Sequence, residues 1–360
     1  MMLRLYLAME QDLLVVSQKN DGAWDVEAHL MGLQPTCLAV DPLQPERLYC
    51  GTFGRGMWRS ADAGASWQPI AAPGAAMEPY DGQGIPHAKV MALAVSPNER
   101  NNGLGVVYAG TEPASLYRSE DGGATWRDLA ALRELPSSSI WSFPPRPYTN
   151  LVRYITPDPH VAGRLFVAIE AGALVHTDDG GQSWHDRTPD GPFDTHTLLM
   201  HPLAPDRLYS AAGDGGGRSP ERGYNESHDA GQSWRRPVEG REYHYLWSMA
   251  IDPADPDTVL ISASPNAGKA HHAHAASVSA IYRKTSTDVW QEVKEGLPDN
   301  QGLVIPILAT NPQEPHCFYT LTNKGLYRSQ DTGQTWEQLP VPWQAAYRSQ
   351  HQQALLVTTI

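Results

Sequence analysis

The 360-residue sequence has few cysteines, no long hydrophobic run and a deficit of positive charge. Its three cysteines, Cys37, Cys50 and Cys317, are an odd number and include no Cys-x-x-Cys pair. They therefore predict neither a disulfide framework nor a structural zinc site, and they suit a reducing compartment.

No apolar run approaches the roughly 18 residues that a membrane-spanning helix needs. The apolar N-terminal segment is interrupted by Glu10, Gln11 and Asp12, and no small-residue cleavage site follows it, so it does not resemble a signal peptide. We therefore expect a cytoplasmic protein with no membrane partner.

Acidic residues outnumber basic ones by 40 to 27, which gives a net charge of −13. Such a charge repels nucleic-acid backbones, so we expect no nucleic-acid partner. The glycine run Gly215–Gly217 follows a strand-like segment but does not open a helix, so it does not predict a phosphate-binding loop. No Ser-His-Asp arrangement is visible either, and we expect no cofactor.

What the sequence does contain is a repeated turn of the form Ser/Thr-x-Asp-x-Gly-x-Ser/Thr-Trp, called the repeat turn below. Its tryptophans recur at a period typical of propellers and other repeat arrays. Five intact copies end at Trp67, Trp126, Trp184, Trp234 and Trp336, and two degenerate copies end at Trp24 and Trp290.

Each residue type in the repeat turn has a physical role. The aspartate can accept hydrogen bonds from backbone N–H groups of a tight turn. The glycine allows a backbone angle that other residues resist, and the tryptophan begins the next strand. We therefore expect the repeat-turn aspartates to be structural: Asp62, Asp121, Asp179, Asp229 and Asp331.

Short β-rich segments surround each repeat turn in the same order, which predicts an all-β fold. We predict a single seven-bladed β-propeller over residues 1–360, with four antiparallel strands per blade and a first blade completed by the C-terminal strand. The predicted blades span approximately 1–30 with 352–360, then 34–70, 88–130, 149–188, 196–238, 245–294 and 302–342.

The repeat turns resemble the Asp-boxes of BNR-repeat propellers. That superfamily includes sialidases, two-propeller xyloglucanases, sortilin-type receptors and photosystem II assembly factors. The resemblance covers nearly the whole chain and implies the propeller fold, with ligands bound on the face opposite the boxes. Sialidases usually carry an Arg-Ile-Pro signature before the first box. Because this chain has only Leu3-Arg4-Leu5-Tyr6 there, the resemblance does not imply sialidase activity.

The long loops of the predicted opposite face are where binding residues are expected. Aligning the first strand of each blade on its closing proline gives a uniform apolar layer that is followed by polar and aromatic side chains. These side chains either surround a central ligand pocket or merely cap the strand ends. They are Lys89, Arg153, Asp194, His196, Tyr245 and Trp247.

Acids recur just after the second strand of several blades, at Glu10, Glu112 and Glu170, and Asp214 is the possible counterpart in the fifth blade. Two carboxylates about 5 to 10 Å apart could hydrolyse a glycosidic bond if one had a raised pKa. We take Glu112, Glu170 and Asp194 as candidate catalytic residues, with solvated surface acids as the alternative.

Aromatic residues also gather in two loops, where rings could stack on sugars or fill gaps between blades. Trp141 represents the first of these loops, and His244 and Tyr245 represent the second. The run His271-His272-Ala273-His274 lies in an Ala- and Ser-rich segment without a nearby carboxylate, so we interpret it as a flexible loop and expect no metal site.

Two functions remain open. The first is a carbohydrate-directed BNR-repeat protein, glycosyl hydrolase-like, that binds a glycan or another small molecule opposite the Asp-boxes. The second is a non-catalytic scaffold that binds a protein partner. Fold alone does not decide between them.

Overall fold

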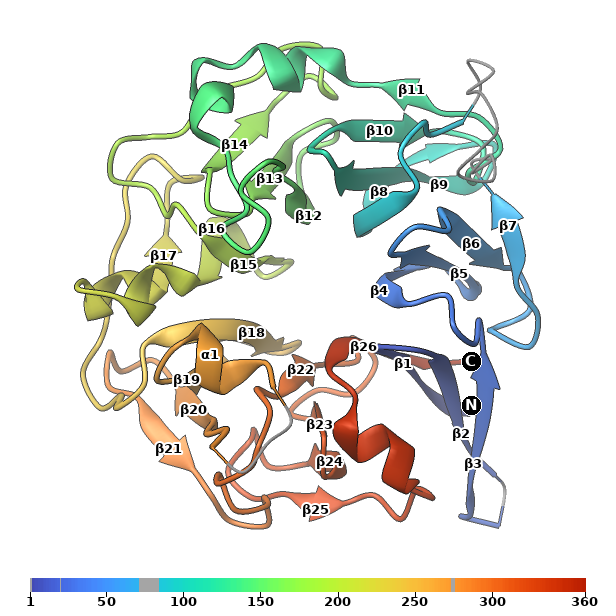
Figure 1. Cartoon of the computed structure of the whole chain (residues 1–360), viewed down its shortest axis with the longest axis vertical. Coiled ribbons are helices and arrows are strands. Elements are labelled where there is room, and N and C mark those ends of the chain that lie inside the picture. Colours follow the sequence, from blue (N-terminus) through green and yellow to red (C-terminus); the bar gives the residue numbers. More distant parts are fainter. Residues whose placement is uncertain (1, 20, 71–83, 273–275) are drawn as a thin grey trace. The chain divides into compact units, whose positions relative to one another are not determined.

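The computed structural model describes residues 2–19, 21–70, 84–272 and 276–360. Its strands form seven small antiparallel sheets, the blades of a seven-bladed β-propeller (Figure 1). This confirms the predicted fold class. The chain divides into two compact units, residues 1–28 with 196–360 and residues 29–195.

The first unit contains blades one, five, six and seven. Blade one has the order β26-β1-β2-β3, and the other three follow the chain. Their strands are β1 (Leu3–Met9), β2 (Leu13–Gln18), β3 (Trp24–His29), β15 (Thr195–His201), β16 (Ala204–Ala212), β17 (Tyr224–Ser227), β18 (Tyr245–Asp252), β19 (Asp255–Ser264), β20 (Ala280–Lys284), β21 (Gln291–Val293), β22 (Ile307–Ala309), β23 (Phe318–Thr322), β24 (Gly325–Ser329), β25 (Glu337–Gln338) and β26 (Gln352–Thr359).

The second unit contains blades two, three and four, again in chain order. Their strands are β4 (Pro35–Asp41), β5 (Gln44–Thr52), β6 (Met57–Ser60), β7 (Gln68–Ile70), β8 (Lys89–Asn101), β9 (Leu104–Glu112), β10 (Leu116–Ser119), β11 (Arg127–Asp128), β12 (Val152–Pro157), β13 (Leu165–Ile169) and β14 (Ala173–Thr177).

Helical structure in the described chain is confined to single turns, and none of them could cross a bilayer. These turns lie in the loops between strands. They are η1 (Ala130–Glu134), η2 (Pro136–Ile140), η3 (Gly213–Gly216), η4 (Pro220–Gly223), α1 (Ala267–Ala270) and η5 (Ala345–Ser349).

The C-terminal strand completes blade one, as predicted. β26 runs antiparallel to β1 from the Leu3–Thr359 pair to the Ala8–Ala354 pair. Met2 and Ile360 exchange backbone hydrogen bonds of 2.8 and 3.0 Å, so the two ends of the chain lie side by side (Figure 1). One edge strand of blade one therefore comes from the opposite end of the sequence.

Blades four and five have only three strands each among the described residues. In place of the fourth strand, each has a single antiparallel bridge, which pairs His176 with His185 in blade four and Glu226 with Arg235 in blade five. The outer segment of each of these two blades therefore has one backbone pair with the third strand.

Neighbouring blades of one unit share a continuous apolar core. In the second unit, side chains from blade three such as Tyr108 and Leu116 pack with Val152 and Ile155 of blade four. The sheets approach so closely that a Cβ on Gly110 would lie 2.4 Å from Val152 Cγ1. Strands in this position are buried on both faces, which explains their nearly continuous apolar sequences.

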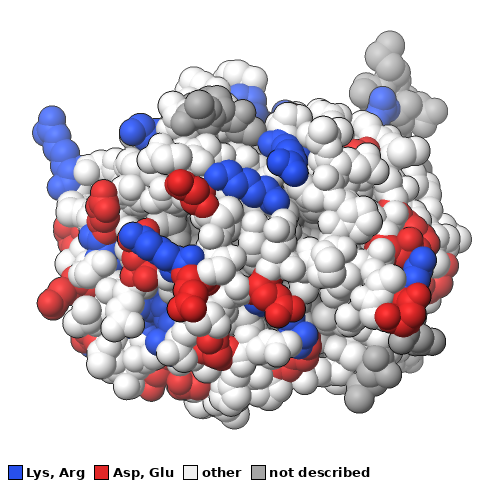
Figure 2. Space-filling model, turned by 90° about the horizontal axis from the view of Figure 1, so that it is seen from below, with Lys and Arg blue, Asp and Glu red and all other residues white. Residues whose placement is uncertain are grey.

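On the face shown in Figure 2, basic side chains are interspersed with acidic ones.

The repeat turns have the same internal hydrogen bonds in each intact copy. In blade five, Asp229 accepts hydrogen bonds from the Ser233 backbone N–H (2.9 Å) and hydroxyl (2.6 Å) and from the Ser227 hydroxyl (2.7 Å). Ser227 Oγ in turn accepts the Gly231 N–H at 2.8 Å. Gly231 has φ = +86°, which glycine adopts without strain. The turn therefore requires the residue types that the sequence repeats.

Replacing Asp229 with alanine should lower the free energy of unfolding by about 1 to 3 kcal/mol, because its donors lose their acceptor. Urea denaturation measures this change. The exposed Glu337 in β25 provides a control, since its replacement by alanine should change stability by less than about 0.5 kcal/mol. Equal effects of the two substitutions would contradict a structural role for the turn carboxylate.

The same hydrogen bonds make this turn sensitive to acid. Hydrogen bonds from Ser233, and then from Ser227, lower the pKa of Asp229 from 3.8 to about 2. Because the folded-state pKa is the lower one, the ionised carboxylate stabilises the fold fully above about pH 4, and this contribution is lost as the pH falls through 2. Asp229→Ala should therefore reduce the slope of stability against pH between about 4 and 2. An unchanged slope would contradict this assignment.

Arg241 is an exception in the apolar packing between blades. The segments Glu239-Gly240-Arg241 and Glu295-Gly296-Leu297 are equivalent, because Glu239 and Glu295 accept the N–H of the next blade's tryptophan at 2.9 and 3.0 Å. Arg241 thus occupies a leucine position. It is 7% exposed, and no guanidinium nitrogen has a hydrogen-bond partner among the described residues. Burial lowers the pKa of Arg241 to about 10.

Replacing Arg241 with leucine should raise the free energy of unfolding by about 1 kcal/mol or more, because a desolvated charge is exchanged for an apolar side chain. The reciprocal change Leu297→Arg should lower stability. Chemical denaturation of both variants measures the effect. A less stable Arg241→Leu protein would show that the guanidinium has a stabilising partner.

Candidate functional site

In the second unit, a buried carboxylate is held between two cations. Glu112 ends β9 and is 3% exposed. Lys89 lies opposite it in β8, with Nζ 3.0 Å from Glu112 Oε1. Arg146, from the loop before β12, places Nε 3.1 Å from Oε1 and donates a second hydrogen bond from Nη2 to Oε2. Glu112 is therefore bound by both cations.

Two phenylalanine rings complete this cationic cluster. Lys89 Nζ lies 4.6 Å from the Phe53 ring centroid, and Arg146 Cζ lies 5.0 Å from it. Arg146 Cζ is also 4.6 Å from the Phe143 ring. Ring faces attract cations, so the phenylalanines help to hold the position of Arg146.

The charge of Glu112 follows from this arrangement. Burial raises its pKa, but hydrogen bonds and charges from Arg146 and Lys89 outweigh burial and lower the pKa below its ordinary value. A general acid requires a raised pKa. Glu112 is therefore ionised near neutral pH, and its geometry suits an anchor for Lys89 and Arg146.

Two other predicted acids meet in the same unit. Glu170, just after β13, is 8% exposed, and its Oε2 lies 3.4 Å from Nε of Arg153 in β12. Asp194 accepts the Ala171 N–H at 2.9 Å. One carboxylate oxygen of Glu170 and one of Asp194 lie within 4.8 Å of each other. The two carboxyl groups are therefore close enough to act on one bound group, as the paired acids of glycosidases do.

The first unit contains an aromatic–histidine cluster, made of Tyr245, Trp247, His271 and His351. Tyr245 and Trp247 are two residues apart in β18, so both rings project from the same face of the strand. The Trp247 ring centroid lies 4.3 Å from that of His271 and 6.3 Å from that of His351. Three segments that are distant in the sequence therefore meet around one half-buried indole.

His196 packs against this cluster from β15. Its ring centroid is 4.5 Å from that of Trp247 and 5.2 Å from that of Tyr245. Its Nδ1 lies 2.6 Å from the carbonyl oxygen of Leu246, which orients the ring. The three residues that the strand register selected in this unit thus lie in mutual contact.

Hydrogen bonds through the cluster have one consistent direction. Gln353 Nε2 lies 3.0 Å from His351 Nδ1, and because an amide nitrogen donates, this Nδ1 accepts. A His351 ring that carries its proton on Nε2 donates it to His271 Nδ1 at 2.8 Å. His271 in turn donates from Nε2 to the Tyr245 hydroxyl at 2.8 Å. The hydrogen bonds therefore form a chain that runs from Gln353 through His351 and His271 and ends at the Tyr245 oxygen, which accepts.

Sequence reasoning did not identify His351, and it interpreted His271 as part of a flexible loop. The hydrogen bonds of His271 show that this interpretation does not hold for that residue. His274 lies outside the described residues. His351 could have been found by extending the C-terminal strand by one residue, because the next residue, Gln352, pairs with Met9 of blade one.

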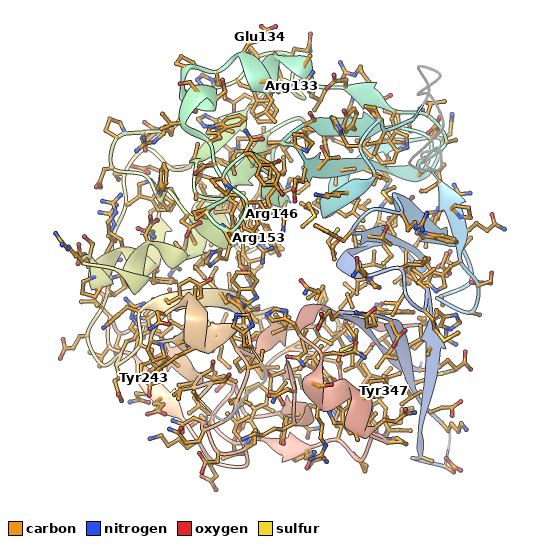
Figure 3. The ribbon with its side chains drawn as sticks, viewed as in Figure 1. Arg133, Glu134, Arg146, Arg153, Tyr243 and Tyr347 are labelled. Atoms are coloured by element: carbon orange, nitrogen blue, oxygen red, sulfur yellow. The ribbon has the colours of Figure 1, made fainter. Side chains whose placement is uncertain are left out.

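The two remaining predicted ligand-binding residues lie in packed surroundings. Trp141 is 7% exposed, and its Nε1 donates to Ser137 Oγ at 3.0 Å. One edge of Trp141 lines a cavity of about 540 Å³ that is also bordered by His87, Tyr117 and Arg133. Figure 3 shows Arg133 well away from Arg146 and Arg153 within this unit.

The second of these residues is His244. Burial, followed by the charge of Arg241, lowers the pKa of His244.

A second cavity, of about 270 Å³, lies in the first unit. Leu297 and Pro298 form part of its wall, together with Lys294 and Thr322. None of the predicted catalytic or ligand-binding residues borders it among the described residues.

With this geometry in place, comparison with known proteins shows partial likeness to xyloglucanases. No family model matches the chain. An oligoxyloglucan-reducing end-specific xyloglucanase of Emericella nidulans is 26% identical over 191 residues, which cover 51% of this chain and 21% of the relative. A xyloglucanase of a Paenibacillus species is 35% identical over 101 residues, covering 25% of this chain and 10% of the relative. The matched segments thus span about a fifth or less of these relatives.

Solved structures give the same fold at low identity. A GH74 enzyme of Niastella koreensis superposes with a TM-score of 0.63 at 15% identity, over 92% of this chain and 53% of that one. A structure of YCF48 bound to D1 peptide superposes with a TM-score of 0.57 at 16% identity, over 91% and 93% of the two chains. At this identity the likenesses show the fold alone, and one of the two superposed chains is a GH74 enzyme while the other is bound to a peptide.

Replacing Glu112 with glutamine should release the loop at 141–150, because Lys89 and Arg146 would then repel each other without a counter-charge. Hydrogen exchange of the 141–150 peptides should become at least tenfold faster, which corresponds to about 1.4 kcal/mol of local opening. Glu134→Gln on η1 is the control and should leave that exchange unchanged. An unchanged exchange rate in Glu112→Gln would contradict the anchoring role.

Proposed function

We propose that this chain is a carbohydrate-directed propeller that binds a glycan through the aromatic–histidine cluster. The observation that carries this proposal is the half-buried Trp247 ring, framed by Tyr245, His271 and His196. Flat aromatic rings pack against the C–H faces of sugars, and the hydrogen-bonded histidines hold these rings in place. Convergent polar groups around an apolar surface are characteristic of small-ligand sites.

The partial similarity to xyloglucanases supports a glycan of the plant cell-wall type. This similarity covers 51% of the chain for the Emericella nidulans enzyme. Xyloglucan oligosaccharides are therefore the first ligands to test, with cello-oligosaccharides and sialyllactose as comparisons.

Replacing Trp247 with alanine should weaken binding of xyloglucan oligosaccharides at least tenfold, equivalent to about 1.4 kcal/mol. Isothermal titration calorimetry measures the change. The control is Tyr148→Ala, which removes an aromatic ring that is 83% exposed in another loop. Equal affinity in the wild type and Trp247→Ala would exclude the cluster as the binding surface.

Hydrolysis is a separate part of the proposal and rests on Glu170 and Asp194. Their carboxylate oxygens lie within 4.8 Å, and Arg153 adjoins Glu170. We propose these two acids as the catalytic pair, with Glu112 as an anchor. Release of reducing ends from xyloglucan by the wild type should fall at least hundredfold in Glu170→Gln and in Asp194→Asn. A wild type that binds glycan but releases no reducing ends would be a binding protein.

A protein-binding scaffold is the second candidate. It is favoured by the nearly full-length superposition on YCF48 bound to D1 peptide, which covers 93% of that chain, against 53% of the GH74 enzyme. Failure to bind any of the tested glycans, together with saturable binding of an extended peptide, would support the scaffold and contradict the glycan proposal.

A further inference from the structure

Blade four has three metal-ligating side chains at its outer edge. His176 belongs to β14, Asp178 is the second residue of the repeat turn, and His185 follows the turn's tryptophan. The two histidines form a cross-strand pair. The His176 N–H donates to the His185 carbonyl at 3.2 Å, and the His185 N–H donates to the His176 carbonyl at 2.8 Å. Their side chains therefore project on the same face.

The three side chains lie close together, and the stacked imidazole rings must turn for both Nε2 lone pairs to point at one ion. The two imidazole rings stack with centroids 4.5 Å apart and planes 14° apart. Phe166 stacks on the other side of His176 at 5.5 Å. Both Nε2 atoms face Asp178 Oδ2, at 3.3 Å from His185 and 3.9 Å from His176. One ligand atom of each residue lies within 4.8 Å of the others.

These distances suit a small metal ion. A tetrahedral ion with bonds of about 2.05 Å separates its ligand atoms by about 3.3 Å. The His185–Asp178 distance equals this value, and the His176–Asp178 distance requires a shift of about half an ångström. The side chains are 31%, 54% and 61% exposed for His176, Asp178 and His185. Water can therefore complete the coordination sphere.

The other repeat turns serve as an internal comparison. The residue before the turn and the residue after its tryptophan form the same cross-strand pair in blades two, three, five and seven. None of these four turns carries ligand groups at all three positions, and some carry ion pairs instead. The equivalent triplets are Arg59–Ala61–Gln68, Arg118–Glu120–Arg127, Glu226–His228–Arg235 and Arg328–Gln330–Glu337.

We propose that His176, Asp178 and His185 bind one divalent transition-metal ion of the zinc, copper or nickel type. Two imidazoles with one carboxylate favour these ions over Mg²⁺ and Ca²⁺, which prefer oxygen ligands. The ion joins β14 to the residue that takes the place of the fourth strand, where blade four has a single bridge. Metal binding there reinforces the outer edge of the blade. This site is independent of the glycan proposal.

The test is calorimetric titration of the tag-free full chain with ZnCl₂ and NiCl₂, with MgCl₂ as the reference ion. The wild type should bind about one equivalent of Zn²⁺ and show no comparable binding of Mg²⁺. His176→Arg and His185→Gln introduce residues that other blades carry at these positions, so the turn should still form. Each should weaken the Zn²⁺ site at least tenfold. His272→Ala is the matched control, because this exposed histidine lies in the other histidine-rich segment, and it should leave the site unchanged.

Two results would overturn the proposal: no zinc binding beyond that of Mg²⁺, or a zinc site that survives both His176→Arg and His185→Gln. Anomalous scattering from zinc-soaked crystals of the wild type provides a measurement that does not depend on the folding of variants. It should place the ion between the two imidazoles and Asp178. Zinc found only at other residues would contradict the site.

Discussion

In the five blades with an intact repeat turn, the outer segment is set by a turn carboxylate that accepts backbone N–H groups. A short outer strand has few ladder hydrogen bonds, so its approach to the preceding strand must be set by the turn. In blade three, Asp121 accepts the Thr125 N–H at 2.9 Å and the Ser119 hydroxyl at 2.8 Å, and Ser119 Oγ accepts the Gly123 N–H at 2.8 Å. The tryptophan after the turn then packs toward the neighbouring sheet. Repetition of this unit produces the propeller from short strands.

Because the turns and strands supply the rigidity, the loops are able to carry ionisable and aromatic groups. The two units do this in different ways. In the second unit, Glu112 and Glu170 are buried acids balanced by arginines from neighbouring segments. In the first unit, hydrogen bonds connect His271, His351 and Tyr245 around Trp247. The first arrangement fixes the positions of charged groups, whereas the second packs aromatic and imidazole rings together.

The comparisons agree with this division between scaffold and site. Proteins of different function superpose on the chain at 15% and 16% identity, so the shared feature is the arrangement of strands and turns. Function must therefore be argued from the side chains of this sequence. The metal-ligating triplet in blade four makes the same point, because its backbone pairing recurs in four other blades and only the side chains differ.

The sequence by itself determined the repeat, the fold class and the pairing of β26 with β1, because turn chemistry and strand patterning are local properties that recur with a visible period. The strand register also selected Tyr245 and Trp247, which share one face of β18. Tertiary structure alone decided which partners reach them. His271 and His351 come from loops without a period, and His176 meets His185 only through cross-strand pairing. Likewise, the pKa of Glu112 is lowered by Arg146 and Lys89 against the opposing effect of burial, and only the fold brings these groups together. Long-range contacts of irregular segments depend on where the folded strands place the loop ends. No short stretch of sequence predicts these positions.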